Sequence, residues 1–314
     1  MLAILAVIAP IFLLIGLGYL AVRSGSFPQD KLPALGTLVA RFALPALILH
    51  SLSSRSPAEM LNGHYLAAYA IGSLSMLLLG TGWAMLARRQ SLPRAALYGL
   101  GMSCSNSAFV GYPIVHQLLG PVATLALALS MVVENLLLLP LGIALSEGDG
   151  SRRDSVWRAF GRSLLGLRRN PIILAIVAGM LLALLGLPLP AVLAKPVAML
   201  GAASAPVALF LIGGSLVGLP LRSVLRDVSV VAGSKLLLHP LLVVAALLLF
   251  APVEPQLAMA GVLLAAMPML SIFPILGQRH EMQGFCAATL LLATMSSFLT
   301  ISLAIWLLQR YPLG

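Results

Sequence analysis

Charged side chains are scarce in this sequence. Only 9% of its 314 residues are Asp, Glu, Lys or Arg, whereas 60% are hydrophobic, and a water-soluble domain of this length carries roughly a quarter charged residues. Aromatic residues are also few, at 6%. So little polar surface excludes a water-soluble globular protein and makes the lipid bilayer the solvent of this chain.

Cysteine and the common catalytic motifs are nearly absent as well. Cys104 and Cys286 lie in apolar stretches, without metal-site spacing or sign of a disulfide, so we expect no metal and no cofactor. The histidines form no metal-ligand pair at helical spacing. His116 is the one we would test, against the simpler alternative of a packed neutral side chain. No HExxH, GxSxG or paired-carboxylate motif is present, so we do not expect an enzyme.

Long apolar runs dominate what is present. A membrane-spanning helix needs about 20 apolar residues. The first run lacks a preceding basic region and a cleavage-like site after it, so we expect a retained span. With this first run included, the chain has ten candidate spans, at 2–22, 32–52, 65–87, 95–119, 121–145, 171–187, 196–218, 228–250, 256–277 and 284–309. The sequence therefore predicts an all-α polytopic membrane protein.

Basic residues predict the orientation. The net charge of +10 could suggest nucleic acid in a soluble protein, but most Lys and Arg fall in alternate short loops between apolar runs. Cytoplasmic loops carry this excess of basic residues, so we expect no nucleic-acid partner. With an even number of spans, both termini then face the outer side.

One polar loop, residues 146–170, divides the chain into a first half at 1–145 and a second half at 171–314. Each half holds five spans, so the second half enters the membrane in the opposite sense, as in an inverted repeat. Two pairs of prolines at matching ordinal positions support the repeat: Pro45 with Pro206, and Pro113 with Pro268.

The fourth and ninth spans are the least uniform. A proline inside a helix frees a carbonyl, and a freed group is costly in hydrocarbon unless protein or water satisfies it. Such breaks expose N–H donors and the positive ends of half-helices, which suit a carboxylate; a plain kink packed by small residues is the alternative. The candidate substrate-binding residues are Ser105, Asn106, Ser107, Gly111 and Pro113 in the fourth span, helped by Ser103, and Pro268 and Ser271 in the ninth.

Four polar residues inside spans are candidates for coupling or charge compensation. Glu134 could couple transport to protons, bind a cation together with Asn135, or pair structurally with Arg41. Arg41 could instead attract an anionic substrate. Lys235 lies close enough to the cytoplasmic side to extend its ammonium to the interface; a gate or a substrate-attracting cation is the alternative.

Four segments carry a family resemblance: RFALPALILHSL, NSAFVGYPIVHQLLG, GSKLLLHPLL and AAMPMLSIFPILG. Together they resemble the auxin efflux carrier family over nearly the whole chain, in particular its bacterial, malonate-transporter-like members. The resemblance implies ten helices in two inverted five-helix repeats, with helices 4 and 9 crossing where they unwind at proline, as in bile-acid symporters and sodium/proton antiporters. Asn106, Pro113 and Pro268 match crossover positions. Ser271 lies near the point where the family often has asparagine.

The same resemblance implies a function and a location. It implies a secondary carrier of mono- or dicarboxylates in the bacterial inner membrane, with spans 3–5 and 8–10 moving against a scaffold of spans 1, 2, 6 and 7, and a homodimer formed through the scaffold. Proton coupling and uniport are both open, and a sodium-coupled symporter is the alternative. A sensor lacks a signalling domain here, and broken helices in both halves favour alternating access over a channel.

Overall fold

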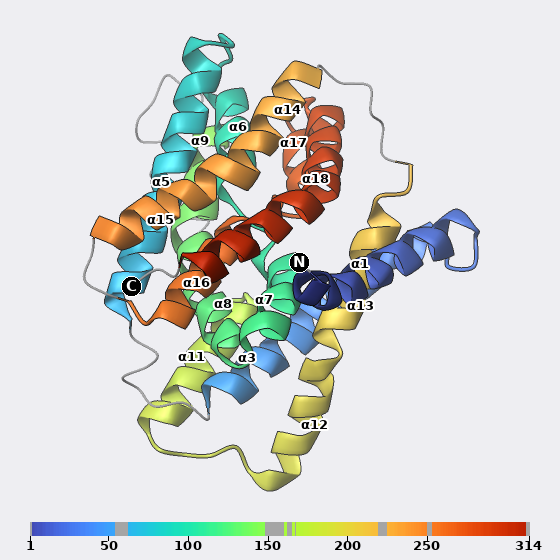
Figure 1. Ribbon diagram of the computed structural model, residues 1–314, viewed down its shortest axis with the longest axis vertical. Coiled ribbons are helices and arrows are strands. Elements are labelled where there is room, and N and C mark those ends of the chain that lie inside the picture. Colours follow the sequence, from blue (N-terminus) through green and yellow to red (C-terminus); the bar gives the residue numbers. More distant parts are fainter. Residues whose placement is uncertain are drawn as a thin grey trace. The chain divides into compact units, whose positions relative to one another are not determined.

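The computed structural model describes residues 2–53, 62–147, 160–161, 165–166, 168–218, 225–249 and 253–311. Within these ranges every regular element is a helix (Figure 1). Six helical segments are long and apolar enough to cross a membrane, and three shorter apolar helices accompany them. The protein is therefore a multi-pass membrane protein. Most of the predicted basic loop at 146–170 lies outside the described residues, and the ten-span inverted repeat stays a prediction.

The chain divides into two compact units, and neither unit is one half of the sequence. Unit 1 comprises residues 1–63, 108–129 and 168–218; unit 2 comprises 64–107, 130–167 and 219–314. The resemblance assigns spans 1, 2, 6 and 7 to the scaffold, and all four fall in unit 1. Residues 108–129 also belong to unit 1. The second half of span 4 and the start of span 5 are therefore grouped with the scaffold spans and not with the moving spans that the resemblance implied.

Unit 1 is held together by helices that meet at glycines. α1 (Leu2–Arg23) packs against α13 (Ser204–Ser215), and a Cβ placed on Gly18 or Gly213 would collide with backbone of the other helix. Small residues let helix backbones approach this closely in membranes, where van der Waals contact replaces the hydrophobic effect.

A second group of helices in unit 1 surrounds α3 (Leu44–Leu52). α11 (Pro171–Leu184) and α12 (Ala191–Ala202) both pack against it (Figure 1). Gly179 of α11 and Gly201 of α12 supply the close approaches. The remaining elements of unit 1 are η1 (Gln29–Lys31), α2 (Leu32–Leu38), α7 (Tyr112–Leu119) and most of α8 (Val122–Val133).

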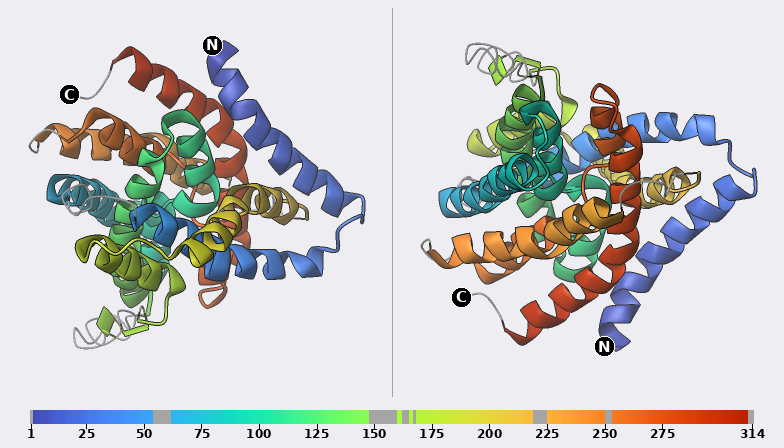
Figure 2. Two further views of the ribbon diagram at one scale, coloured as in Figure 1. Left: turned by 90° about the horizontal axis from the view of Figure 1, so that it is seen from below. Right: turned by 90° about the horizontal axis from the view of Figure 1, so that it is seen from above.

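Unit 2 is built on long helices. α14 (Leu225–Gly233) and α15 (His239–Leu249) continue one another, and α18 (Gln283–Arg310) lies beside them (Figures 1 and 2). Its other helices are α5 (Gly63–Leu86), α6 (Leu92–Ser103), α9 (Leu139–Glu147), α16 (Pro255–Ala265) and α17 (Phe273–Gln278).

Four wide helical turns have a common cause in the sequence. Each is a five-residue π-helix that ends two residues before a proline, because proline lacks an N–H and its ring crowds the carbonyl four residues back. Widening the preceding turn relieves both defects without breaking the helix. The four are η2 (Val39–Ala43) before Pro45, η3 (Ser107–Gly111) before Pro113, η4 (Glu134–Leu138) before Pro140, and η5 (Ser234–Leu238) before Pro240.

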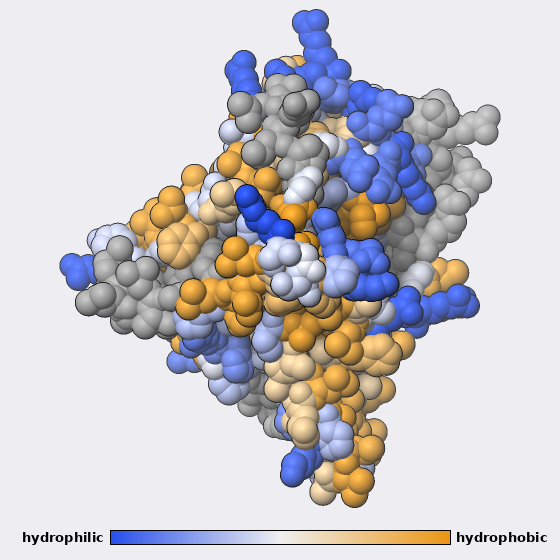
Figure 3. All heavy atoms as spheres, turned by 90° about the vertical axis from the view of Figure 1, so that its right-hand side faces the viewer, coloured by the Kyte–Doolittle hydropathy of each residue, from blue (hydrophilic) through white to orange (hydrophobic). Residues whose placement is uncertain are grey.

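The surface agrees with a lipid environment. Large apolar side chains are widely exposed, with Val192 85% and Leu249 82% accessible, and apolar residues cover much of the face shown in Figure 3. In water so much exposed apolar surface would drive aggregation. In a bilayer it faces acyl chains at no such cost.

Candidate functional site

The fourth span is interrupted, but not by the glycine and proline that predicted the break. α6 ends at Ser103, Cys104 is extended, and the helix resumes at Ser107. Gly111 closes η3 and Pro113 is the second residue of α7, so both lie inside the second half-helix. The prediction that Pro113 breaks the span is therefore wrong, because the π-turn before it accommodates the missing N–H.

The ninth span is interrupted where the sequence predicted. α16 ends at Ala265 and α17 begins at Phe273, and Pro268 lies buried between them. Pro274 is the second residue of α17, as Pro113 is of α7. By position in its half-helix, Pro113 thus corresponds to Pro274 and not to Pro268, with which the sequence analysis matched it.

The two interruptions meet inside unit 2. The backbone N–H of Asn106 donates to the carbonyl of Pro268 at 2.8 Å, and Ser105 and Met269 form an isolated antiparallel β-bridge. The side-chain amide of Asn106 donates to Oγ of Ser271 at 2.7 Å. Backbone groups that the breaks leave without helical partners are thus satisfied by the opposite segment, as a low-dielectric interior requires. Four of the predicted substrate-binding residues lie together here.

Glu134 lies beside this crossing, at the first position of η4. Its side chain is 2% exposed, and Oε1 accepts hydrogen bonds from the Tyr69 hydroxyl and from Oγ of Ser107, both at 2.9 Å. Ser107, the fifth predicted residue, therefore joins the crossing to the one deep carboxylate that the sequence singled out. Such hydrogen bonds stabilise a buried carboxylate that burial alone would disfavour.

Lys235, in η5, contacts Ser105 on the side away from Glu134. Its side chain is fully buried, so the interpretation of an ammonium that extends to the interface is wrong. Nζ donates to Ser105 Oγ at 2.8 Å and to the Ala265 carbonyl at 2.6 Å, and it lies 3.0 Å from Nδ1 of His239. An ammonium has three hydrogens, and these three acceptors use all of them.

His239 extends the network by one more bond. If Nδ1 accepts from Lys235, then Nε2 carries the proton and donates to Oγ of Ser73, which lies 2.9 Å away. Among the described residues Glu134 and Lys235 form no direct ion pair, but they interact electrostatically, and Ser105 lies between them. The cluster is therefore an extended polar network and not a simple salt bridge.

The sequence analysis did not identify several members of this network. Tyr65 shares a 2.7 Å hydrogen bond with Ser130 and stacks on Tyr69; Tyr69, Ser73 and His239 were missed as well. A signal for them existed. Tyr65, Tyr69 and Ser73 are spaced four residues apart, which places them on one face of α5, and Lys235 and His239 have the same spacing.

The remaining candidates lie elsewhere. Asn135 donates from Nδ2 to the Met131 carbonyl of its own helix at 2.9 Å. Arg41 is exposed, in η2 of unit 1, whereas Glu134 accepts hydrogen bonds from Tyr69, from Ser107 and from the backbone of Ser105. A pairing of Arg41 with Glu134, and a cation site shared by Glu134 and Asn135, stay predictions. Among the described residues no cluster of His, Cys, Asp and Glu could hold a metal ion.

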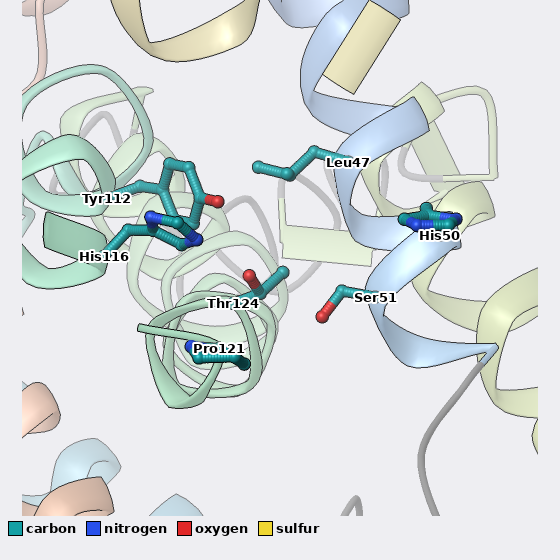
Figure 4. A pocket seen from close by; sticks show the side chains of 7 residues that line it. All are labelled: Leu47, His50, Ser51, Tyr112, His116, Pro121 and Thr124. Atoms are coloured by element: carbon teal, nitrogen blue, oxygen red, sulfur yellow. The ribbon is translucent and has the colours of Figure 1, made fainter. Parts of the chain in front are cut away.

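Unit 1 contains a separate cavity of about 460 Å³. Figure 4 shows it between α3 on one side and α7 with the start of α8 on the other. His116 projects into it and is exposed, so the alternative of a fully packed histidine does not hold. The lining residues are Leu47, His50, Ser51, Tyr112, His116, Pro121 and Thr124.

Comparisons with known proteins agree with this architecture. A family model described as membrane transport protein matches residues 3–307. A "Putative malonate transporter" of Rhizobium meliloti is 29% identical over 98% of this chain and 96% of its own length. An "Uncharacterized transporter" of Methanothermobacter thermautotrophicus is 25% identical over 94% of this chain and 95% of its own.

A plant protein matches over a shorter stretch. Auxin efflux carrier component 2 of Arabidopsis thaliana is 29% identical over 48% of this chain and 23% of its own length. The prediction of a transporter and not an enzyme is thereby confirmed, as is the resemblance to the family across the chain. The chain belongs to the membrane transport protein family, the auxin efflux carrier family that its own motifs indicate.

Proposed function

We propose that this protein is a secondary transporter of small organic anions, mono- or dicarboxylates, that works by alternating access. The observation that carries the proposal is the crossing of two interrupted helices at Asn106 and Pro268. Broken helices of this kind form substrate sites in membrane carriers, because half-helix N-termini offer N–H donors to anionic groups. The half-helix that begins at Ser107 and continues through α7 supplies such an end.

The local charge supports an anion. Lys235 is a buried ammonium within one residue of Asn106 through its bond to Ser105, and the Asn106 amide is a further donor. Glu134 carries the opposite charge to Lys235. Its carboxylate is held by hydrogen bonds from Tyr69 and Ser107, not by a bond to Asn106. The name of the Rhizobium relative favours a short dicarboxylate such as malonate as the first ligand to try.

For coupling, we propose that Glu134 binds and releases a proton during the cycle. A sodium-coupled mechanism is the alternative. Sodium needs several oxygen ligands, and two oxygens at the crossing, Ser105 Oγ and the Ala265 carbonyl, already accept bonds from Lys235. This observation favours the proton over sodium.

We further propose the topology that the basic residues indicate: a bacterial inner-membrane protein with both termini outside, two inverted five-helix repeats, and a homodimer formed through scaffold helices. The positive-inside distribution supports the orientation. The occurrence of an interrupted helix in each half of the sequence supports the repeat.

Uptake by proteoliposomes tests the function and the coupling together. Purified protein in vesicles should accumulate radiolabelled malonate, with a thermal-shift screen of mono- and dicarboxylates to rank other ligands, since a ligand of the folded state raises the melting temperature. Replacing sodium by choline should leave uptake unchanged. Loss of uptake in choline would establish the sodium alternative, and the absence of any carboxylate that binds or is transported would refute the proposal.

A further inference from the structure

The cavity of unit 1 is chemically distinct from the crossing. Its walls come from the second half of α3, from α7 between Tyr112 and His116, and from Pro121 with the first turn of α8, all within one compact unit.

The side chains that converge on the cavity are neutral hydrogen-bonding groups. Figure 4 shows the hydroxyls of Ser51, Tyr112 and Thr124 turned toward the space between α3 and α7. The imidazole of His116 stands beside Tyr112, with ring centroids 5.2 Å apart. The seven lining residues include no carboxylate, lysine or arginine. An anion would meet donors here without repulsion and without a tight ion pair.

The apolar part of the lining limits the ligand class further. Leu47 and Pro121 offer carbon surface opposite the hydroxyls, which suits a short carbon chain that carries a carboxylate. Sites along a conduction path must bind strongly enough to admit a solute and weakly enough to release it. Hydroxyl and imidazole donors meet this requirement, because a neutral hydrogen bond contributes little net free energy.

We propose that this cavity, here called the vestibule, is a second binding site for small carboxylates. The inference rests on the proposed function for its ligand class, but binding at the cavity can be tested independently. The vestibule binds through Ser51, Tyr112, Thr124 and His116. Asn106, in unit 2, is not part of it.

Cysteine labelling provides the test. Both native cysteines, Cys104 and Cys286, are fully buried, so a single introduced cysteine gives the dominant signal with a charged thiol reagent. Ser51→Cys reports on the vestibule. Gln117→Cys is the matched control, because Gln117 is exposed and adjacent to His116 but does not line the cavity. Labelling rates are measured in vesicles with and without malonate.

Malonate should slow the labelling of Ser51→Cys and leave Gln117→Cys unchanged, and the protection should persist when Asn106→Ala is added. Tyr112→Phe and Thr124→Val should each raise the malonate concentration needed for protection about two- to tenfold, the value of one hydrogen bond. Protection that is absent, equal at Gln117→Cys, or abolished by Asn106→Ala would overturn the vestibule. The proposed site at the crossing is tested separately, and a transport rate that Asn106→Ala leaves unchanged would overturn it.

Discussion

The two units place their polar residues differently. Nearly all the buried polar side chains of the described residues belong to unit 2, including Glu134, Asp227, Lys235 and His239, whereas Thr124 and Ser204 are those of unit 1. Unit 1 is held by apolar helices that meet at glycines. Buried polar groups are costly unless bonded, so the comparison shows that the chain concentrates its buried polar network in unit 2.

The buried polar side chains of unit 2 are joined by hydrogen bonds between helices. At its edge, Arg88 and Tyr98 both donate to Oδ2 of Asp227, which joins the segment after α5 and α6 to α14. Deeper in the unit, the network runs from Ser73 through His239 and Lys235 to Ser105. A connected polar network of this kind is sensitive to the loss of any single member. Substitutions in the two units should therefore have different signatures, which the following experiments compare.

The largest effect is expected for Lys235→Met. It removes the cation that three acceptors surround and leaves Glu134 as an uncompensated buried charge, which destabilises by about 3–5 kcal/mol. We expect transport to be lost and the melting temperature to fall. The double variant Glu134→Gln/Lys235→Met should recover part of the stability, because neither charge remains. If the double variant is no more stable than Lys235→Met, the two charges are not coupled.

Next in size is Asn106→Ala. It removes the donor to Ser271 but keeps the backbone bond to Pro268, so the fold should survive at a cost of about 1–3 kcal/mol. Malonate should raise the melting temperature less than in the original protein, because only the vestibule still binds it, and uptake should fall at least about tenfold, which corresponds to about 1.4 kcal/mol. Ser271→Ala is the control that removes only the partner. An unchanged ligand-induced shift in Asn106→Ala would contradict the site assignment.

For a substitution in the helix packing of unit 1, away from its cavity, we expect an effect on stability alone. Gly213→Ala places a methyl group against the carbonyl of Ile15, and such overpacking costs about 1–3 kcal/mol. The melting temperature should fall while the affinity for malonate stays that of the original protein. Gly16→Ala is the matched control on α1, since a Cβ there meets nothing within 4 Å. A changed affinity in Gly213→Ala would show that helix packing in unit 1 also shapes the substrate site.

The smallest structural change is Glu134→Gln, which keeps an oxygen acceptor for Tyr69 and Ser107. Under proton symport, uptake by the original protein should rise as the outside is made more acidic than the inside, because the proton is a co-substrate. The variant should lose this dependence and retain most of its stability. Tyr69→Phe keeps the carboxylate and should keep the pH response. An unchanged pH profile in Glu134→Gln would remove the proposed coupling role.

Local physics made much of the fold predictable. The apolar runs predicted membrane-spanning helices, and Met267-Pro268 predicted the break before α17 correctly. The break of the fourth span was misplaced at Pro113, because a proline that follows a π-turn and a proline in a broken helix give the same local pattern. Only hydrogen bonds across the chain, such as that from Asn106 to Pro268, distinguish the two.

By itself, the sequence determined that this chain is embedded in a bilayer and that the segments before Pro113 and around Pro268 interrupt apolar spans with polar residues or proline. It also identified Glu134 as a carboxylate inside a span and a functional candidate. The tertiary structure decided the partners: Lys235 turned inward to Ser105 and not outward to the interface, and Tyr69 supplied the bond to Glu134. Hydropathy is a sum over neighbours in sequence and can be read locally. The satisfaction of a buried polar group depends on which distant segments fold against it, so it can be read only in space.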